Sequence, residues 1–133
     1  MRILIAEDDE TCSLILASQL KPFGTIVIVE DGEAVIKAFT TELVKQQPFD
    51  LICLDIMMPG LDGQACLRCI RAIEQAFGRI GGAGVKILMT TSINGPETIM
   101  SAFRSQCEGY LVKPIEQAKL VAQLAGLGFV PGK

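Results

Sequence analysis

The chain has no basic run, no long apolar run and no signal-peptide organisation at its N-terminus. Its 12 basic and 15 acidic residues give a net charge of −3, so nothing indicates a nucleic-acid-binding surface. The longest apolar stretches are about strand length, well short of the ~20 residues that a membrane span needs. Met1 and Arg2 lead straight into a strand pattern. We therefore expect a cytoplasmic protein that binds neither nucleic acid nor a membrane directly.

Histidine and tryptophan are absent, and cysteine occurs five times. An odd number of cysteines argues against a disulfide framework. One CxxC is present, but helical spacing places its cysteines on an apolar stripe: Cys66, Cys69, Ile70, Ile73 and Phe77. With no second CxxC and no histidine, we interpret these cysteines as reduced core residues rather than a metal or redox site.

Apolar runs alternate with helical patterns along the 133 residues, half of which are hydrophobic. The predicted strands are 2–7, 25–29, 50–54, 85–90 and 110–112. The predicted helices are 11–20, 33–45, 64–77, 96–106 and 115–125. Strands alternating with helices predict an α/β fold, a parallel sheet covered on both faces. The length suits one domain, residues 1–133.

Two helix starts and one loop have specific predictions. Asp31 and Asp62 are predicted N-caps of helices 33–45 and 64–77. In the last helix we expect Leu120, Val121 and Leu124 to face inward. Segment 77–84, FGRIGGAG, follows a helix and precedes a strand, so we interpret it as a flexible connection rather than a phosphate-binding glycine loop.

Acidic residues stand where predicted strands end. Glu7 and Asp8 end the first apolar run, Asp55 ends the third, and Lys113 ends the fifth. If these runs are neighbouring parallel strands, three carboxylates and one ammonium meet at the sheet edge where α/β proteins bind ligands. Clustered carboxylates repel one another unless a cation neutralises them, so the pattern indicates a divalent metal and one reactive carboxylate. In isolation, however, the acidic pair is also typical of a helix cap, Asp55 of a turn, and Lys113 of the surface. For Asp9 we expect an exposed position at a helix N-terminus.

Four motifs, in order, resemble the response-regulator receiver domains of two-component signalling. They are ILIAEDD (3–9), LDIMMPGLDG (54–63), ILMTTS (87–92) and GYLVKP (109–114). The resemblance covers nearly the whole chain. It implies a doubly wound, five-stranded parallel sheet of order 2-1-3-4-5 with five helices, the flavodoxin-like or CheY-like arrangement.

By this resemblance Asp55 is the phosphoacceptor and forms an aspartyl phosphate. Glu7 and Asp8 would hold Mg²⁺, Asp8 directly and Glu7 through water, with the backbone carbonyl of Met57 as a further oxygen ligand. Lys113 would bind a phosphoryl oxygen and offset its charge.

Thr91 and Tyr110 match the switch pair of the family. The resemblance implies that the Thr91 hydroxyl bonds a phosphoryl oxygen and makes room for Tyr110 to rotate inward. The choice of Thr91 over Thr90 depends on strand register, and Tyr110 is also open to interpretation as an edge or interface aromatic. The peptide bond between Lys113 and Pro114 is expected to be cis.

The phosphodonor must be another molecule because this chain lacks histidine. We expect a histidine kinase or phosphotransfer protein as donor, a downstream protein target, and a monomer or a phosphorylation-dependent dimer. Leu14 and Ile15 either dock the helical donor or pack in the core. Because only GLGFVPGK follows Ala125, we expect a stand-alone receiver.

Met57 lies two residues past Asp55, and Ile93 lies two residues past Thr91. Both side chains should flank the phosphoryl group. Neither orients water, so we predict slow self-dephosphorylation. No enzymatic activity is expected beyond self-phosphorylation and self-dephosphorylation. An alternative is a small Mg²⁺-dependent phosphohydrolase with an aspartyl nucleophile, although such enzymes usually carry a second Asp where this chain has Met57. A flavodoxin-like electron carrier is disfavoured by the missing tryptophan, the single tyrosine and the acids at the FMN phosphate position.

Overall fold

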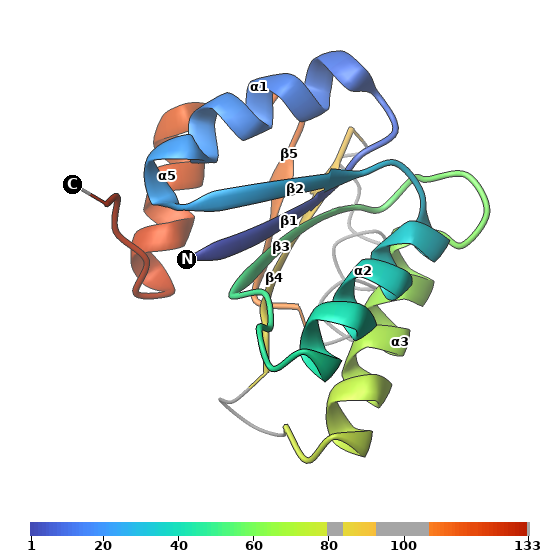
Figure 1. Ribbon diagram of the computed structural model, residues 1–133. Helices are drawn as coiled ribbons and strands as arrows, with labels where there is room; N and C mark the ends of the chain where they lie inside the picture. Colours follow the sequence, from blue (N-terminus) through green and yellow to red (C-terminus); the bar gives the residue numbers. More distant parts are fainter. Residues whose placement is uncertain (80–83, 93–106, 133) are drawn as a thin grey trace.

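Five parallel strands form one sheet in the order β2-β1-β3-β4-β5 (Figure 1). The computed structural model describes residues 1–79, 84–92 and 107–132. The strands are β1 (Arg2–Ala6), β2 (Thr25–Val29), β3 (Leu51–Asp55), β4 (Lys86–Thr91) and β5 (Gly109–Val112). The predicted order 2-1-3-4-5 is confirmed, and each strand lies within a residue or so of its predicted position.

Helices cover both faces of the sheet, α1 and α5 on one side and α2 and α3 on the other (Figure 1). They are α1 (Glu10–Leu20), α2 (Gly32–Val44), α3 (Gly63–Ala76) and α5 (Gln117–Gly126), with a short 3₁₀ helix η1 (Lys21–Phe23) before β2. Of the five predicted helices, 96–106 lies outside the described residues, as does part of the predicted connection 77–84. No helix in the described ranges is long and apolar enough to cross a membrane.

The core has two halves, one on each face of the sheet. Ile52 and Leu54 of β3 pack toward α2 and α3, whereas Leu51 and Cys53 pack toward α1 and α5. Side chains alternate between the faces along a strand, so a strand covered on both sides is apolar at successive positions. This explains the unbroken apolar runs of β1 and β3, whose burial on both faces is confirmed.

Three aspartates cap helices at the carboxyl-terminal edge of the sheet. Asp9, Asp31 and Asp62 begin α1, α2 and α3. Their Oδ1 atoms accept backbone N–H bonds from Cys12, Ala34 and Ala65 at 3.0, 2.8 and 2.8 Å. The bond from the Cys12 N–H lowers the pKa of Asp9. The predicted caps at Asp31 and Asp62, and the exposed helix-starting role of Asp9, are confirmed.

Two predicted helix faces need correction. Val121 is exposed rather than inward-facing, while Leu120 and Leu124 are buried as predicted. Phe77 lies just beyond α3 and is half exposed, so the apolar stripe of this helix ends earlier than its spacing indicated. Cys66 is buried, and its Sγ lies 3.5 Å from the Gly32 carbonyl oxygen. Burial raises the pKa of the Cys66 thiol to about 12, which agrees with a packing role.

A buried carboxylate that the sequence did not reveal anchors the amino end of β4. Glu74 of α3 is 2% exposed, and its carboxylate accepts from Arg71 at 2.7 Å and from the Val85 N–H at 2.6 Å. Arg71 also reaches Glu108 at 2.9 Å, and Glu108 accepts from the Ile87 N–H at 2.6 Å. The network ties α3, β4 and the start of β5 together at the edge opposite the acidic cluster.

Candidate functional site

The ends of three strands bring together the four charged residues that the sequence singled out. Glu7 and Asp8 follow β1, Asp55 is the last residue of β3, and Lys113 follows β5. β1 and β3 are neighbours, so their acidic ends lie side by side at the carboxyl edge of the sheet. Lys113 extends from the far side of β4 to reach them. The predicted convergence is confirmed.

Asp55 is held by one hydrogen bond to each carboxylate oxygen. Its side chain is nearly buried, Oδ1 accepts the Met57 N–H at 3.1 Å, and Oδ2 accepts from Lys113 Nζ at 3.1 Å. These bonds fix the rotation of the carboxylate. Each oxygen retains lone pairs, because a carboxylate has about four acceptor positions.

Lys113 binds two carboxylates at once. Its ammonium group pairs with Glu7 as well as with Asp55, and its backbone N–H donates to the Thr91 carbonyl oxygen at 2.7 Å. Burial alone would lower the pKa of Lys113, but the hydrogen bonds to the two carboxylates outweigh burial, and the pKa is raised. The ammonium group therefore stays protonated at neutral pH. The Lys113–Pro114 peptide bond is cis, as predicted.

The remaining charge of the cluster is negative. Glu7, Asp8 and Asp55 each offer a carboxylate oxygen, and these oxygens lie within 4.8 Å of one another. With Lys113 the formal charge is −3 + 1 = −2. Glu7 is further fixed because it accepts the Asp9 N–H at 3.1 Å. Two uncompensated negative charges in a partly buried site favour a divalent cation.

The donor set fits Mg²⁺. All three side chains offer oxygen, the ligand type that Mg²⁺ requires, and Asp8 is exposed, so water can complete the coordination. Magnesium keeps several waters and is usually bound by one or two carboxylates plus substrate phosphate oxygens. The three carboxylates therefore form a ligand set whose chemistry suits Mg²⁺.

The loop after Asp55 is positioned by close backbone contacts. A Cβ on Gly63 would lie 2.1 Å from the Asp55 carbonyl oxygen, and the Gly63 N–H donates to the Ile56 carbonyl at 3.0 Å. A Cβ on Gly32 would lie 2.1 Å from the Leu61 carbonyl oxygen. Only glycine permits these approaches. Gly63 was part of a predicted motif, but no sequence pattern assigned it this role.

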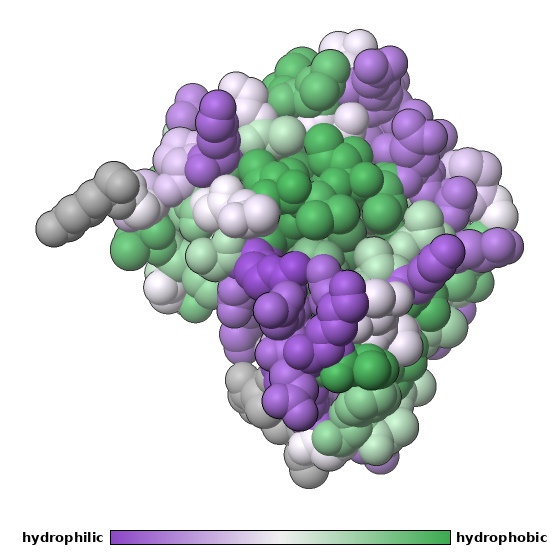
Figure 2. All heavy atoms as spheres, in the orientation of Figure 1, coloured by the Kyte–Doolittle hydropathy of each residue, from purple (hydrophilic) through white to green (hydrophobic). Residues whose placement is uncertain are grey.

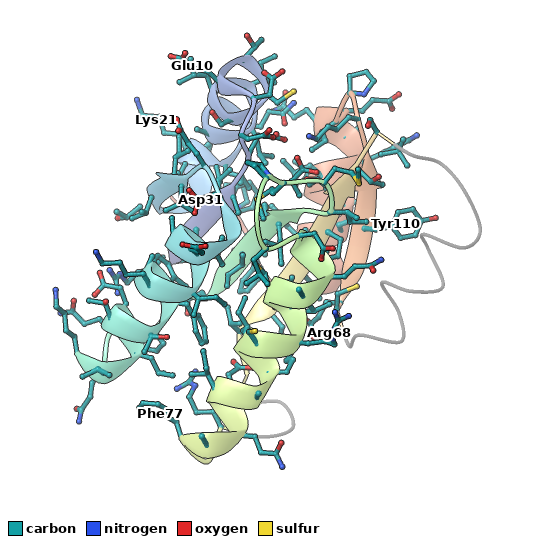
Figure 3. The ribbon with its side chains drawn as sticks, turned by 90° about the vertical axis from the view of Figure 1, so that its right-hand side faces the viewer. Glu10, Lys21, Asp31, Arg68, Phe77 and Tyr110 are labelled. Atoms are coloured by element: carbon teal, nitrogen blue, oxygen red, sulfur yellow. The ribbon has the colours of Figure 1, made fainter. Side chains whose placement is uncertain are left out.

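The strand register separates the two adjacent threonines. Thr90 is the β4 residue opposite Asp55, whereas Thr91 shares its face with Met89 and with Tyr110 of β5. Both threonines are buried. Thr91, not Thr90, therefore lies on the same face of the sheet as Tyr110. Figure 3 shows Tyr110 directed outward from the sheet, and it is partly buried.

Two candidate docking residues lie on the surface of α1. Leu14 is 57% and Ile15 is 52% exposed, so the alternative that they pack in the core is wrong. Met57 is also exposed. Ile93, its predicted counterpart beside the phosphoryl group, lies outside the described residues.

The acidic cluster and the lysine lie at the carboxyl edge of a doubly wound sheet, the edge at which α/β proteins of this architecture bind their ligands. The model of the response regulator receiver domain family matches residues 3–125, and the chain belongs to this family. It is a receiver domain of two-component signal transduction, a family of phosphoacceptor signalling modules rather than turnover enzymes.

The curated relatives are longer proteins. The chain is 31% identical over 120 residues to the sensor protein GacS of Pseudomonas syringae pv. syringae, covering 90% of this chain and 12% of GacS. It is 29% identical over 128 residues to the transcriptional regulatory protein RprY of Bacteroides fragilis, covering 96% of this chain and 49% of RprY. The chain thus spans half or less of these relatives.

Solved receiver structures share the fold. A chain of the CheX–CheY–BeF₃–Mg²⁺ complex of Borrelia burgdorferi matches with a TM-score of 0.82 and 20% identity, covering 96% of this chain and 89% of that one. The receiver domain of the histidine kinase CKI1 of Arabidopsis thaliana, complexed with Mg²⁺ and BeF₃⁻, matches with a TM-score of 0.78 and 21% identity, covering 95% and 89%. At these identities the likeness shows the fold alone.

Proposed function

We propose that Asp55 accepts a phosphoryl group reversibly, in a site that binds Mg²⁺. The observation that carries this proposal is the placement of Asp55: a nearly buried carboxylate, oriented by Met57 and Lys113, within 4.8 Å of two other carboxylates. Glu7 and Asp8 are the proposed metal-binding side chains, together with Asp55 and the Met57 carbonyl oxygen.

The proposed transfer is an in-line displacement. A carboxylate oxygen of Asp55 forms the new bond to phosphorus, while the bond from phosphorus to the donor imidazole nitrogen breaks and its electron pair stays on that nitrogen. Bound Mg²⁺ would neutralise charge on the phosphoryl oxygens. Lys113 is already oriented toward Asp55, and its ammonium group would move from the carboxylates to a phosphoryl oxygen.

The proposed output is a shift between two conformations. The Thr91 hydroxyl would bond a phosphoryl oxygen, and Tyr110, on the same face, would turn from its outward position toward the core. Contacts that exist in only one conformation shift the population toward it. A downstream protein would then recognise the changed surface around β5.

The proposed donor is the phosphohistidine of a histidine kinase or phosphotransfer protein. Exposed Leu14 and Ile15 on α1 support docking of such a protein, because α1 begins beside the acidic cluster. We further propose that residues 1–133 form one receiver domain and that this domain acts in the cytoplasm.

Acetyl phosphate, a small-molecule phosphodonor, tests the proposal without a cognate kinase. The wild type should gain the mass of one phosphoryl group in Mg²⁺, and none when the metal is chelated. Asp55→Asn should gain none. The matched control is Asp50→Asn, an exposed position just before β3, where the amide oxygen can still accept the Arg2 N–H that Asp50 binds at 2.7 Å. Asp50→Asn should react as the wild type does, and full labelling of Asp55→Asn would refute the proposal.

A further inference from the structure

Among the described residues, strand β2 forms an exposed apolar edge of the sheet. It is the outermost strand, its sequence is TIVIV, and Val27 and Ile28 are 37% and 39% exposed. Figure 2 shows a continuous apolar surface over β2, in the middle of this face of the molecule. Most apolar side chains of the other strands are buried.

The edge also carries main-chain groups that have no partner in the described part of the chain. Thr25 donates to the Met1 carbonyl and Val29 accepts from the Glu7 N–H, so the odd-numbered residues of β2 bond to β1. Because these directions alternate along a strand, the N–H and C=O groups of Ile26 and Ile28 point away from the sheet. The Gly132 N–H donates to the Pro22 carbonyl oxygen of η1, not to β2.

Natural edge strands usually carry a device against pairing, such as a lysine, a proline, a bulge or a covering segment. Within β2 there is no charge and no proline, and its pairing with β1 is regular over all five residues. We infer that β2 pairs with β2 of a second copy of this chain, antiparallel, to give a continuous ten-stranded sheet about a twofold axis.

The outward-pointing N–H and C=O groups occur at alternate residues of β2, and this alternation fixes the register between the two β2 strands. Ile26 of one copy and Ile28 of the other exchange N–H···O bonds, and the symmetry-related pair does the same, which makes four bonds. Val27 then lies opposite its own equivalent, on the twofold axis, in a non-hydrogen-bonded position. Thr25 lies opposite Val29 of the other copy. One surface is complementary to itself, as a twofold interface requires.

The flanking charges favour the antiparallel direction. Exposed Lys21 precedes β2, whereas exposed Glu30, Asp31 and Glu33 follow it. An antiparallel pair brings the lysine end of one copy to the acidic end of the other at both ends of the interface. A parallel pair would place like charges together.

This pairing is independent of the proposed phosphoacceptor. Asp55 lies on β3, and the proposed switch residue Tyr110 lies on β5, at the other edge of the sheet. Self-association through β2 should therefore be the same in wild type and in Asp55→Asn, so failure of one proposal does not bear on the other.

Sedimentation equilibrium tests the self-association. Because a five-residue ladder is a small interface, we expect a dissociation constant on the order of 0.1 mM, measured from about tenfold below to tenfold above this concentration. Val27→Lys should weaken the dimer at least about tenfold. The matched control is Val44→Lys, which replaces a 63% exposed valine at the end of α2 and should leave the dimer unchanged. A wild type that is monomeric throughout, or equal effects of the two lysines, overturns the inference.

Cysteine cross-linking tests the register even where the lysine variant misfolds. Val27→Cys should form a disulfide-linked dimer under mild oxidation, above the wild-type background, because its Cα atoms would lie about 4.5 Å apart. Thr25→Cys alone should not form this disulfide, because the cysteines at position 25 of the two copies would lie about 13 Å apart along the strand. A mixture of Thr25→Cys and Val29→Cys should cross-link. Cross-linking of Thr25→Cys to itself, or none at Val27→Cys, contradicts the antiparallel pair.

Discussion

Replacing Gly63 with alanine would place a methyl group against the strand end that carries Asp55. The new Cβ would lie 2.1 Å from the Asp55 carbonyl oxygen, 2.8 Å from the Asp55 carbonyl carbon and 2.8 Å from Cα of Ile56. All three neighbours are backbone atoms, so no side chain can rotate away. Moving the carbonyl oxygen to an ordinary contact of 3.4 Å requires a shift of 3.4 − 2.1 = 1.3 Å between α3 and β3.

The cost follows from these contacts. Overpacking of a tight site costs about 1–3 kcal/mol. Loss of the bond from the Gly63 N–H to the Ile56 carbonyl, now 3.0 Å, adds about 1 kcal/mol. We expect Gly63→Ala to lower the free energy of unfolding by about 2–4 kcal/mol. A displacement of about 1 Å at Asp55 should also slow phosphorylation by acetyl phosphate about 100-fold.

Urea unfolding followed by circular dichroism suits this chain, which has no tryptophan. The matched control is Gly126→Ala, at the end of α5, where a Cβ would meet nothing within 4 Å. There the same substitution should raise the free energy of unfolding by up to about 1 kcal/mol, because alanine favours the helix more than glycine does. If Gly63→Ala matches the wild type in stability and in labelling rate, the role assigned to this contact is wrong.

Three further predictions concern the site lysine, the buried thiols and the phosphoryl lifetime. Lys113→Met should lower the free energy of unfolding at pH 7 by about 3 kcal/mol without Mg²⁺ and by less with Mg²⁺, because two buried carboxylates lose their cation. Lys119→Met replaces a 72% exposed lysine, so its change in the free energy of unfolding should be near zero in the same urea titration. Burial raises the pKa of the Cys53 and Cys66 thiols to about 12. Iodoacetamide at pH 8 should therefore leave both thiols unmodified in the folded protein and modify both in urea. Rapid modification of either thiol in the native state would contradict their core role. The exposed Met57 side chain cannot orient an attacking water, so the phosphorylated protein should have a lifetime of minutes or longer in Mg²⁺. Met57→Glu should shorten this lifetime. A wild-type lifetime of seconds would refute the reasoning.

The features that could be predicted from the sequence depend on residues close together in the chain or on patterns that recur along it. Unbroken apolar runs identified the central strands because both faces of β1 and β3 are covered. The caps at Asp31 and Asp62 were predictable because each side chain bonds an N–H only three residues away. The convergence of the charged residues followed once neighbouring parallel strands were assumed, since their carboxyl ends share one edge.

Contacts between distant segments could not be predicted. Glu74 lies in a helix stretch with several polar residues, yet it is buried because Arg71 and the Val85 N–H satisfy its carboxylate. The pairing of Lys113 with Glu7 depends on how far a side chain reaches across β4. Val121 follows the apolar spacing of its helix but lies at the margin of the covered face.

Identification of the residue that carries the phosphoryl group tests the central claim most directly. Borohydride reduces an aspartyl phosphate to homoserine, which marks the modified position permanently. Trypsin should release the peptide 46–68, which contains Asp50, Asp55 and Asp62. After labelling in Mg²⁺ and reduction, we expect homoserine at position 55 alone. Homoserine at position 50, 62 or 8, with position 55 unchanged, would contradict the account.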